Sequence, residues 1–130
     1  MLANDIAAML EAATIGTKGT DLFIGPDASL PPGDGPYVSV LPTGGTSPDD
    51  TQTSSYRRPS AQIVARAKDY KTAEAKALAA FNAVVNKFNQ TINGVWYLSI
   101  TPNQSEPFDM GKDDVGRPRC GFNVNAVKRP

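Results

Sequence analysis

The stretch that decides the fold is residues 58–75, RPSAQIVARAKDYKTAEA, in which the spacing of the apolar side chains changes near Lys68. Before Lys68, apolar residues occupy every second position, which predicts a half-buried strand over residues 61–67. After Tyr70 the apolar period lengthens to three or four residues, which predicts a helix. The stretch is therefore expected to form a strand at a sheet edge, after which the chain reverses direction into a helix that covers the same sheet.

This helix is expected to begin at Asp69, whose carboxylate can accept a free backbone N–H of the first turn. Its apolar stripe consists of Ala77, Leu78, Phe81, Val84, Val85 and Phe88. The pattern predicts a helix that continues to about Asn89, about 30 Å in length, which could cross a whole face of a sheet.

Shorter elements are predicted on both sides of this unit. A short amphipathic helix is expected at the N-terminus, over residues 3–14, with Gly16 as its stop. Asn93-Gly94 fits a two-residue hairpin turn. Further strands are predicted over residues 21–25, 37–41, 95–101 and 119–128. This order predicts a single α+β domain over residues 1–130, with a mainly antiparallel sheet, a long helix packed on one face and a short N-terminal helix.

Two polar segments interrupt the predicted elements. Residues 42–57 and 102–118 are expected to be long loops, and the second ends in a turn with Asp113 first and Gly116 fourth. Loops of this length in a small domain are usually functional or disordered.

The composition excludes several classes of protein. Thirteen Lys and Arg balance thirteen Asp and Glu, so the net charge is zero, which argues against a dedicated nucleic-acid binder. No apolar run approaches the roughly 18 residues of a membrane span, and the N-terminus lacks the cationic start of a secretory signal. With one cysteine, no intrachain disulfide can form, so a reducing compartment is the simplest expectation.

Catalytic patterns are missing from the sequence. The chain has no histidine, which removes the common nucleophilic triads and most zinc sites. Cys120 lies in a predicted strand without a base nearby and is expected to be a buried apolar residue. Residues 16–20 have the wrong spacing for a phosphate-binding loop, and residues 109–114 lack the glycine and glutamate of a calcium loop. No cofactor or metal is therefore expected.

Aromatic and charged residues offer candidates for contacts with other proteins. Tyr56 with Arg57 and Arg58 closes the first loop, and these residues are either a phosphate or protein contact or a solvated loop end. Trp96 is expected in the core, which places Tyr97 on the opposite, exposed face of its strand as a contact candidate.

The order and spacing of many residues resemble the phage tail terminator, or minor capsid, family of small head–tail joining proteins. The strand-to-helix part of the resemblance comprises Arg58, Pro59, Gln62, Ile63, Arg66, Asp69, Tyr70, Ala73 and Ala77. The C-terminal part comprises Tyr97–Ile100, Gln104, Pro107, Gly111, Asp113, Gly116–Pro118, Phe122 and Lys128–Pro130, and the N-terminal helix followed by residues 16–23 also fits.

This resemblance implies a virion structural protein without catalytic residues, made in the host cytoplasm. Such proteins form a ring, typically of six copies, that caps the tail tube and faces the head connector, while DNA passes through the lumen without specific binding. Residues 43–57 and 102–118 would contact partners, and Arg58, Arg66, Asp113 and Arg117 are the charged contact candidates. Glu106 and Asp109 make the second loop more acidic than the family pattern suggests.

Two alternatives remain open from the sequence. One is another head–tail connector component, such as a stopper or a tail-completion protein. The other is a small enzyme or ligand-binding domain, against which the missing histidine and phosphate loop count.

Overall fold

The computed structural model describes residues 2–26, 30–33, 35–45 and 56–129. Its elements follow in the order α1 (Leu2–Ala12), β1 (Leu22–Ile24), β2 (Tyr37–Pro42), β3 (Ser60–Arg66), α2 (Tyr70–Val84), β4 (Lys87–Ile92), β5 (Val95–Pro102), β6 (Phe108–Lys112) and β7 (Pro118–Lys128). The predicted α+β class is confirmed, because these residues form one mostly antiparallel sheet and two helices. The pair of β1 and β2 is parallel.

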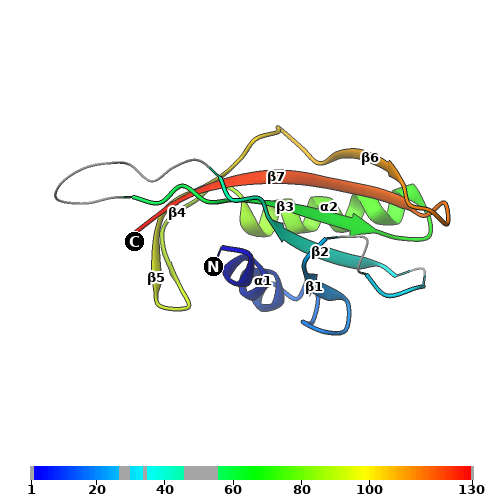
Figure 1. Ribbon diagram of the computed structural model, residues 1–130, viewed down its shortest axis with the longest axis horizontal. Coiled ribbons are helices and arrows are strands. Elements are labelled where there is room, and N and C mark those ends of the chain that lie inside the picture. The colour runs from blue at the N-terminus through cyan, green and yellow to red at the C-terminus, as the bar shows by residue number, and fades with distance from the viewer. Residues whose placement is uncertain (1, 27–29, 34, 46–55, 130) are drawn as a thin grey trace.

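The sheet is built around β7, the longest strand, which crosses the molecule in Figure 1. One edge of β7 pairs with β3 from Arg119 to Asn125. Its other edge pairs with β6 near its start and with β5 near its end, so these two strands follow each other along it. The β4–β5 hairpin therefore lies at one end of the molecule and the turn from β6 to β7 at the other (Figure 1).

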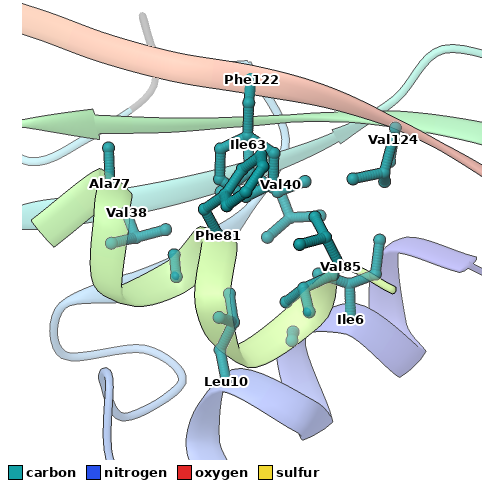
Figure 2. Close-up of a cluster of buried hydrophobic side chains, with 14 of the residues drawn as sticks. Ile6, Leu10, Val38, Val40, Ile63, Ala77, Phe81, Val85, Phe122 and Val124 are labelled. Carbon is teal, nitrogen blue, oxygen red and sulfur yellow. The ribbon is translucent and has the colours of Figure 1, made fainter. Parts of the chain in front are cut away.

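Both helices pack on the same face of the sheet, and the core lies between them and the strands (Figure 2). The ring of Phe81 from α2 meets that of Phe122 from β7 edge to face, with centroids 5.1 Å apart. The predicted inward face of β7 is confirmed, since Cys120, Phe122, Val124 and Ala126 are all buried. We call this the helix face of the sheet and the opposite side its outer face.

The unit from β3 to α2 forms as its sequence predicts in period and cap, but the predicted place of its strand at a sheet edge is wrong, because β3 lies between β2 and β7. Ala61, Ile63 and Ala65 belong to the core, in agreement with the period of two. The carboxylate of Asp69 accepts a hydrogen bond from the backbone N–H of Thr72 at 2.8 Å, so the predicted cap is confirmed. The hairpin turn is also confirmed, because Asn93 and Gly94 both have positive φ and connect paired Ile92 and Val95.

The predicted length of the second helix is wrong. α2 has 15 residues and ends at Val84, about 22 Å from its start. Val85 is already extended, and Asn86 follows in the left-handed region with φ of 57°. Asparagine tolerates this conformation, which commonly ends helices, and the chain then gains ladder hydrogen bonds by pairing with β5.

The predicted apolar stripe of this helix is correspondingly wrong in part. Phe88 belongs to β4 and is 58% exposed, and Leu78 is 46% exposed on the solvent side of α2. The buried helix residues are Ala73, Ala77, Ala80, Phe81 and Val84. Small alanines on this face let α2 lie close to the strands.

The prediction that Tyr97 is exposed is wrong, because Tyr97 is fully buried and Trp96 is only partly buried. The pairing of β5 with β7 shifts register between Tyr97 and Ser99, which marks a β-bulge. A bulge inserts one extra residue and reverses the alternation of faces beyond it. Tyr97 and Ile100 therefore both point into the core, while Leu98 between them is 44% exposed.

The second predicted loop, residues 102–118, is not structureless, because it contains β6. Its closing turn is as predicted, with the backbone N–H of Gly116 donating to the carbonyl of Asp113 at 3.0 Å. The first predicted loop, residues 42–57, lies largely outside the described residues. Near its C-terminal end, Arg57 forms a backbone bridge with Lys128.

Candidate assembly surfaces

The first candidate surface lies on the outer face, at the end of the sheet where β6 turns into β7. Tyr37, Arg66 and Arg119 are register partners on neighbouring strands β2, β3 and β7. Their neighbours in sequence, such as Ala65 and Cys120, belong to the core, so these three side chains point the other way. The guanidinium carbon of Arg66 lies 5.6 Å from the centre of the Tyr37 ring.

Asp113 connects this group to the turn that precedes β7. Its carboxylate accepts hydrogen bonds from the backbone N–H of Val115 and from both the backbone N–H and the Nε of Arg117, at 2.8–3.0 Å. The Nε of Arg66 lies 3.6 Å from the same carboxylate. Burial tends to raise the pKa of Asp113, but these hydrogen bonds and the charge of Arg117 outweigh it and lower that pKa.

These residues line a hollow of about 330 Å³, which we call the basic hollow. Its described lining residues are Leu30, Pro32, Arg66, Lys112, Asp113, Asp114, Val115, Arg117 and Arg119. The set contains four cationic and two anionic side chains. Three predicted contact candidates meet here, because the fold brings Arg66 to Asp113 and Arg117, which are close to each other but far from Arg66 in sequence.

Lys112 and Arg119 belong to the basic hollow but were not predicted. Arg119 precedes Cys120 and Phe122, which point inward. The alternation of faces along a strand therefore predicts from the sequence that the Arg119 side chain lies on the outer face. Lys112 could not have been placed, because it reaches the hollow only through the pairing of β6 with β7.

A second candidate surface lies at the opposite end of β7, which we call the C-terminal end. Arg57 and Lys128 exchange two backbone hydrogen bonds of 2.9 Å there, and Arg58 lines a hollow of about 410 Å³ beside Ser99. Tyr56, next to Arg57, is partly buried. Arg129 lies over the ring of Trp96, 4.5 Å from its centre. Arg119 and Lys128 are nine positions apart in β7, about 30 Å.

Tyr97 belongs to neither surface. Its hydroxyl donates to the buried carboxylate of Asp5, and burial together with that carboxylate raises the pKa of Tyr97. The structure therefore assigns Tyr97 a contact within the fold rather than the predicted exposed one.

The described residues offer no grouping of reactive side chains. Cys120 is buried, and burial, followed by the negative charges of Glu74 and Asp109, raises the pKa of its thiol. Among the residues that the structure covers, no three His, Cys, Asp or Glu side chains gather where they could hold a metal ion. Neither described helix has the length and apolar character needed to cross a membrane.

The described residues therefore present charged surfaces at both ends of one sheet, which are candidates for contacts with other proteins. Comparison with known families agrees: the model of the bacteriophage tail terminator protein family matches residues 9–129, nearly the whole chain. The chain belongs to this family, and is thus a structural protein of the phage virion.

A solved structure with a similar fold belongs to the virion of a native gene transfer agent particle. The two chains are 19% identical, with a TM-score of 0.71, and the match covers 99% of this chain and 95% of the other. At this identity the similarity concerns the fold. A search of curated proteins finds no match.

Proposed function

We propose that this protein is a tail terminator that forms a ring of six copies, caps the finished tail tube and joins it to the head connector. The observation that carries the proposal is the family match over residues 9–129. The similar chain in a gene transfer agent virion supports it, because that chain too is part of an assembled particle.

The distribution of surfaces supports a ring. A closed ring is made of heterologous contacts, in which each copy presents two different surfaces to its two neighbours. The basic hollow is one surface of this kind, and the C-terminal end, about 30 Å away along β7, is available to the tail tube or the head connector. Strand β4, at the end of the strand order, also presents an edge that a neighbour could use.

Within such a ring, the segments 43–57 and 102–118 would make the contacts with neighbouring copies, the tail tube and the head connector. The protein would act without catalysis and without a cofactor. The net charge of zero suits a lumen through which DNA slides without specific binding, because phosphate binding requires clustered cations along the path.

The proposal is tested first by the mass of the purified protein, measured by light scattering over a range of concentrations. We expect a hexamer, or a monomer that converts to a hexamer at high concentration or on added tail tubes. Cryo-electron microscopy of tubes with bound protein should then show a ring at the end of the tube that faces the head. Density on the head side, away from the tube, would assign the protein to the stopper class.

A further inference from the structure

The basic hollow is recessed, which limits what it can bind. The side chains of Arg66, Arg117 and Asp113 are only 4%, 14% and 17% exposed, so their charges lie inside the hollow rather than on its rim. The broad backbone of a DNA duplex contacts cations that project from a surface, whereas a single inserted carboxylate can reach a recessed guanidinium. Arginine pairs with carboxylates through its fork of N–H donors.

An acidic patch, formed by Glu74 and Asp109, lies on the other face at the same end of the sheet. Asp109 is the register partner of Cys120, whose side chain lies under α2, so Asp109 lies on the helix face. Glu74 is in the early part of α2, about one helical turn after Tyr70. α2 begins four residues after Arg66, the register partner of Arg119, so Glu74 also lies over the start of β7 on the helix face.

The acidic patch is accessible. Glu74 and Asp109 are both exposed, and the ring of Tyr70 beside them is 43% exposed. Exposed tyrosine is common in protein interfaces. Lys71, three residues before Glu74, is also exposed and reduces the net charge of this region.

We propose that neighbouring copies contact each other head to tail, with the Glu74–Asp109 patch of one copy covering the basic hollow of the next and one of its carboxylates entering the hollow. The two surfaces have opposite charge, which favours their pairing, and they are different surfaces of the chain, as a heterologous contact requires. A second copy of this chain is thus the occupant that charge complementarity favours. This inference rests on the proposed ring and names its subunit contact.

The test reverses one exposed charge on each surface. Lys112→Glu changes the rim of the basic hollow, and Glu74→Lys changes the acidic patch. Each variant alone should need at least about tenfold more protein for half-assembly, because like charges then face each other. Lys18→Glu, an exposed charge reversal in the segment between α1 and β1, is the matched control and should assemble as the unchanged protein does.

Mixing the two variants is the decisive measurement. In a ring that alternates the two variants, one kind of contact pairs the original Glu74 with the original Lys112. The other kind pairs lysine at position 74 with glutamate at position 112, so every contact joins opposite charges. An equimolar mixture should therefore regain assembly, measured by light scattering. Unfolding curves for each variant separate loss of contact from loss of fold. Raising the salt from 0.1 M to 1 M should weaken assembly of the unchanged protein as its charges are screened.

Several results would overturn this contact. If the unchanged protein forms rings and both variants do so equally well, or if the mixture is not rescued, the contact is wrong while the ring stands. If Lys112→Glu instead abolishes a salt-dependent affinity for DNA, the hollow binds phosphate. Failure of the unchanged protein to assemble, even on tail tubes, would overturn the proposed function and this contact together.

Discussion

The hydroxyl of Tyr97 donates a hydrogen bond to the carboxylate of Asp5, joining β5 to α1 across 92 residues of chain. The side-chain amide of Asn93, in the hairpin turn, donates to the other oxygen of the same carboxylate at 2.9 Å. Asp5 is only 3% exposed, so these two donors supply the hydrogen bonds that its buried oxygens need. The N-terminal helix is thereby attached to the β4–β5 hairpin.

Replacing Tyr97 with phenylalanine should destabilise the protein by about 1.5–3 kcal/mol, since it removes a hydrogen bond to a buried charged group. The measurement is the free energy of unfolding in urea. Tyr70→Phe is the matched control, because Tyr70 is 43% exposed, and it should change stability by less than about 0.5 kcal/mol. Equal effects of the two substitutions would show that the contact with Asp5 contributes little.

The contribution of Asp113 to the stability of the folded protein should depend on pH. Its pKa in the folded protein is below the ordinary value of 3.8, so its contribution is fully present above that pH and is lost as the pH falls through the folded value. Unfolding midpoints of the unchanged protein and of Asp113→Asn should therefore differ at pH 7, and this difference should shrink as the pH falls below 3.8. A difference that stays constant with pH would contradict this role for the carboxylate.

The end of α2 should depend on the left-handed conformation of Asn86, whose φ is 57°. Asn86→Ala should destabilise the protein by about 1 kcal/mol, because a Cβ disfavours this region. Asn86→Gly should be neutral or slightly stabilising by the same argument. Thermal or urea unfolding of both variants measures this, and a helix that continued to Asn89 would instead favour alanine over glycine.

The thiol of Cys120 should resist modification in the folded protein. It is completely buried, and burial with the nearby charges of Glu74 and Asp109 raises its pKa, so little thiolate forms at neutral pH. A thiol reagent should react at the rate of unfolding in buffer and rapidly in concentrated urea. Rapid reaction in buffer alone would mean that α2 separates readily from β7.

Much of the fold was predictable from local pattern. The alternation in residues 61–67 and 119–128 identified β3 and β7 and their inward faces, and Asp69 identified the start of α2. The end of that helix was missed although Asn86 carried a usable signal, because the apolar spacing continues through Val84 and Val85 into Phe88. β6 left little signal, since most of its side chains are exposed on both faces.

The sequence by itself determined the class of the fold, the central strand and helix, and the lack of a catalytic histidine, because these depend on composition and on periods within a few residues. Only the tertiary structure decided the direction of Tyr97 and the meeting of Arg66 with Asp113 and Arg117. The first depends on one extra residue in the pairing of β5 with β7, and the second on strands that bring distant residues together. Pairing between distant strands cannot be inferred from the spacing of residues along the chain, so the candidate subunit contact could be identified only in the folded molecule.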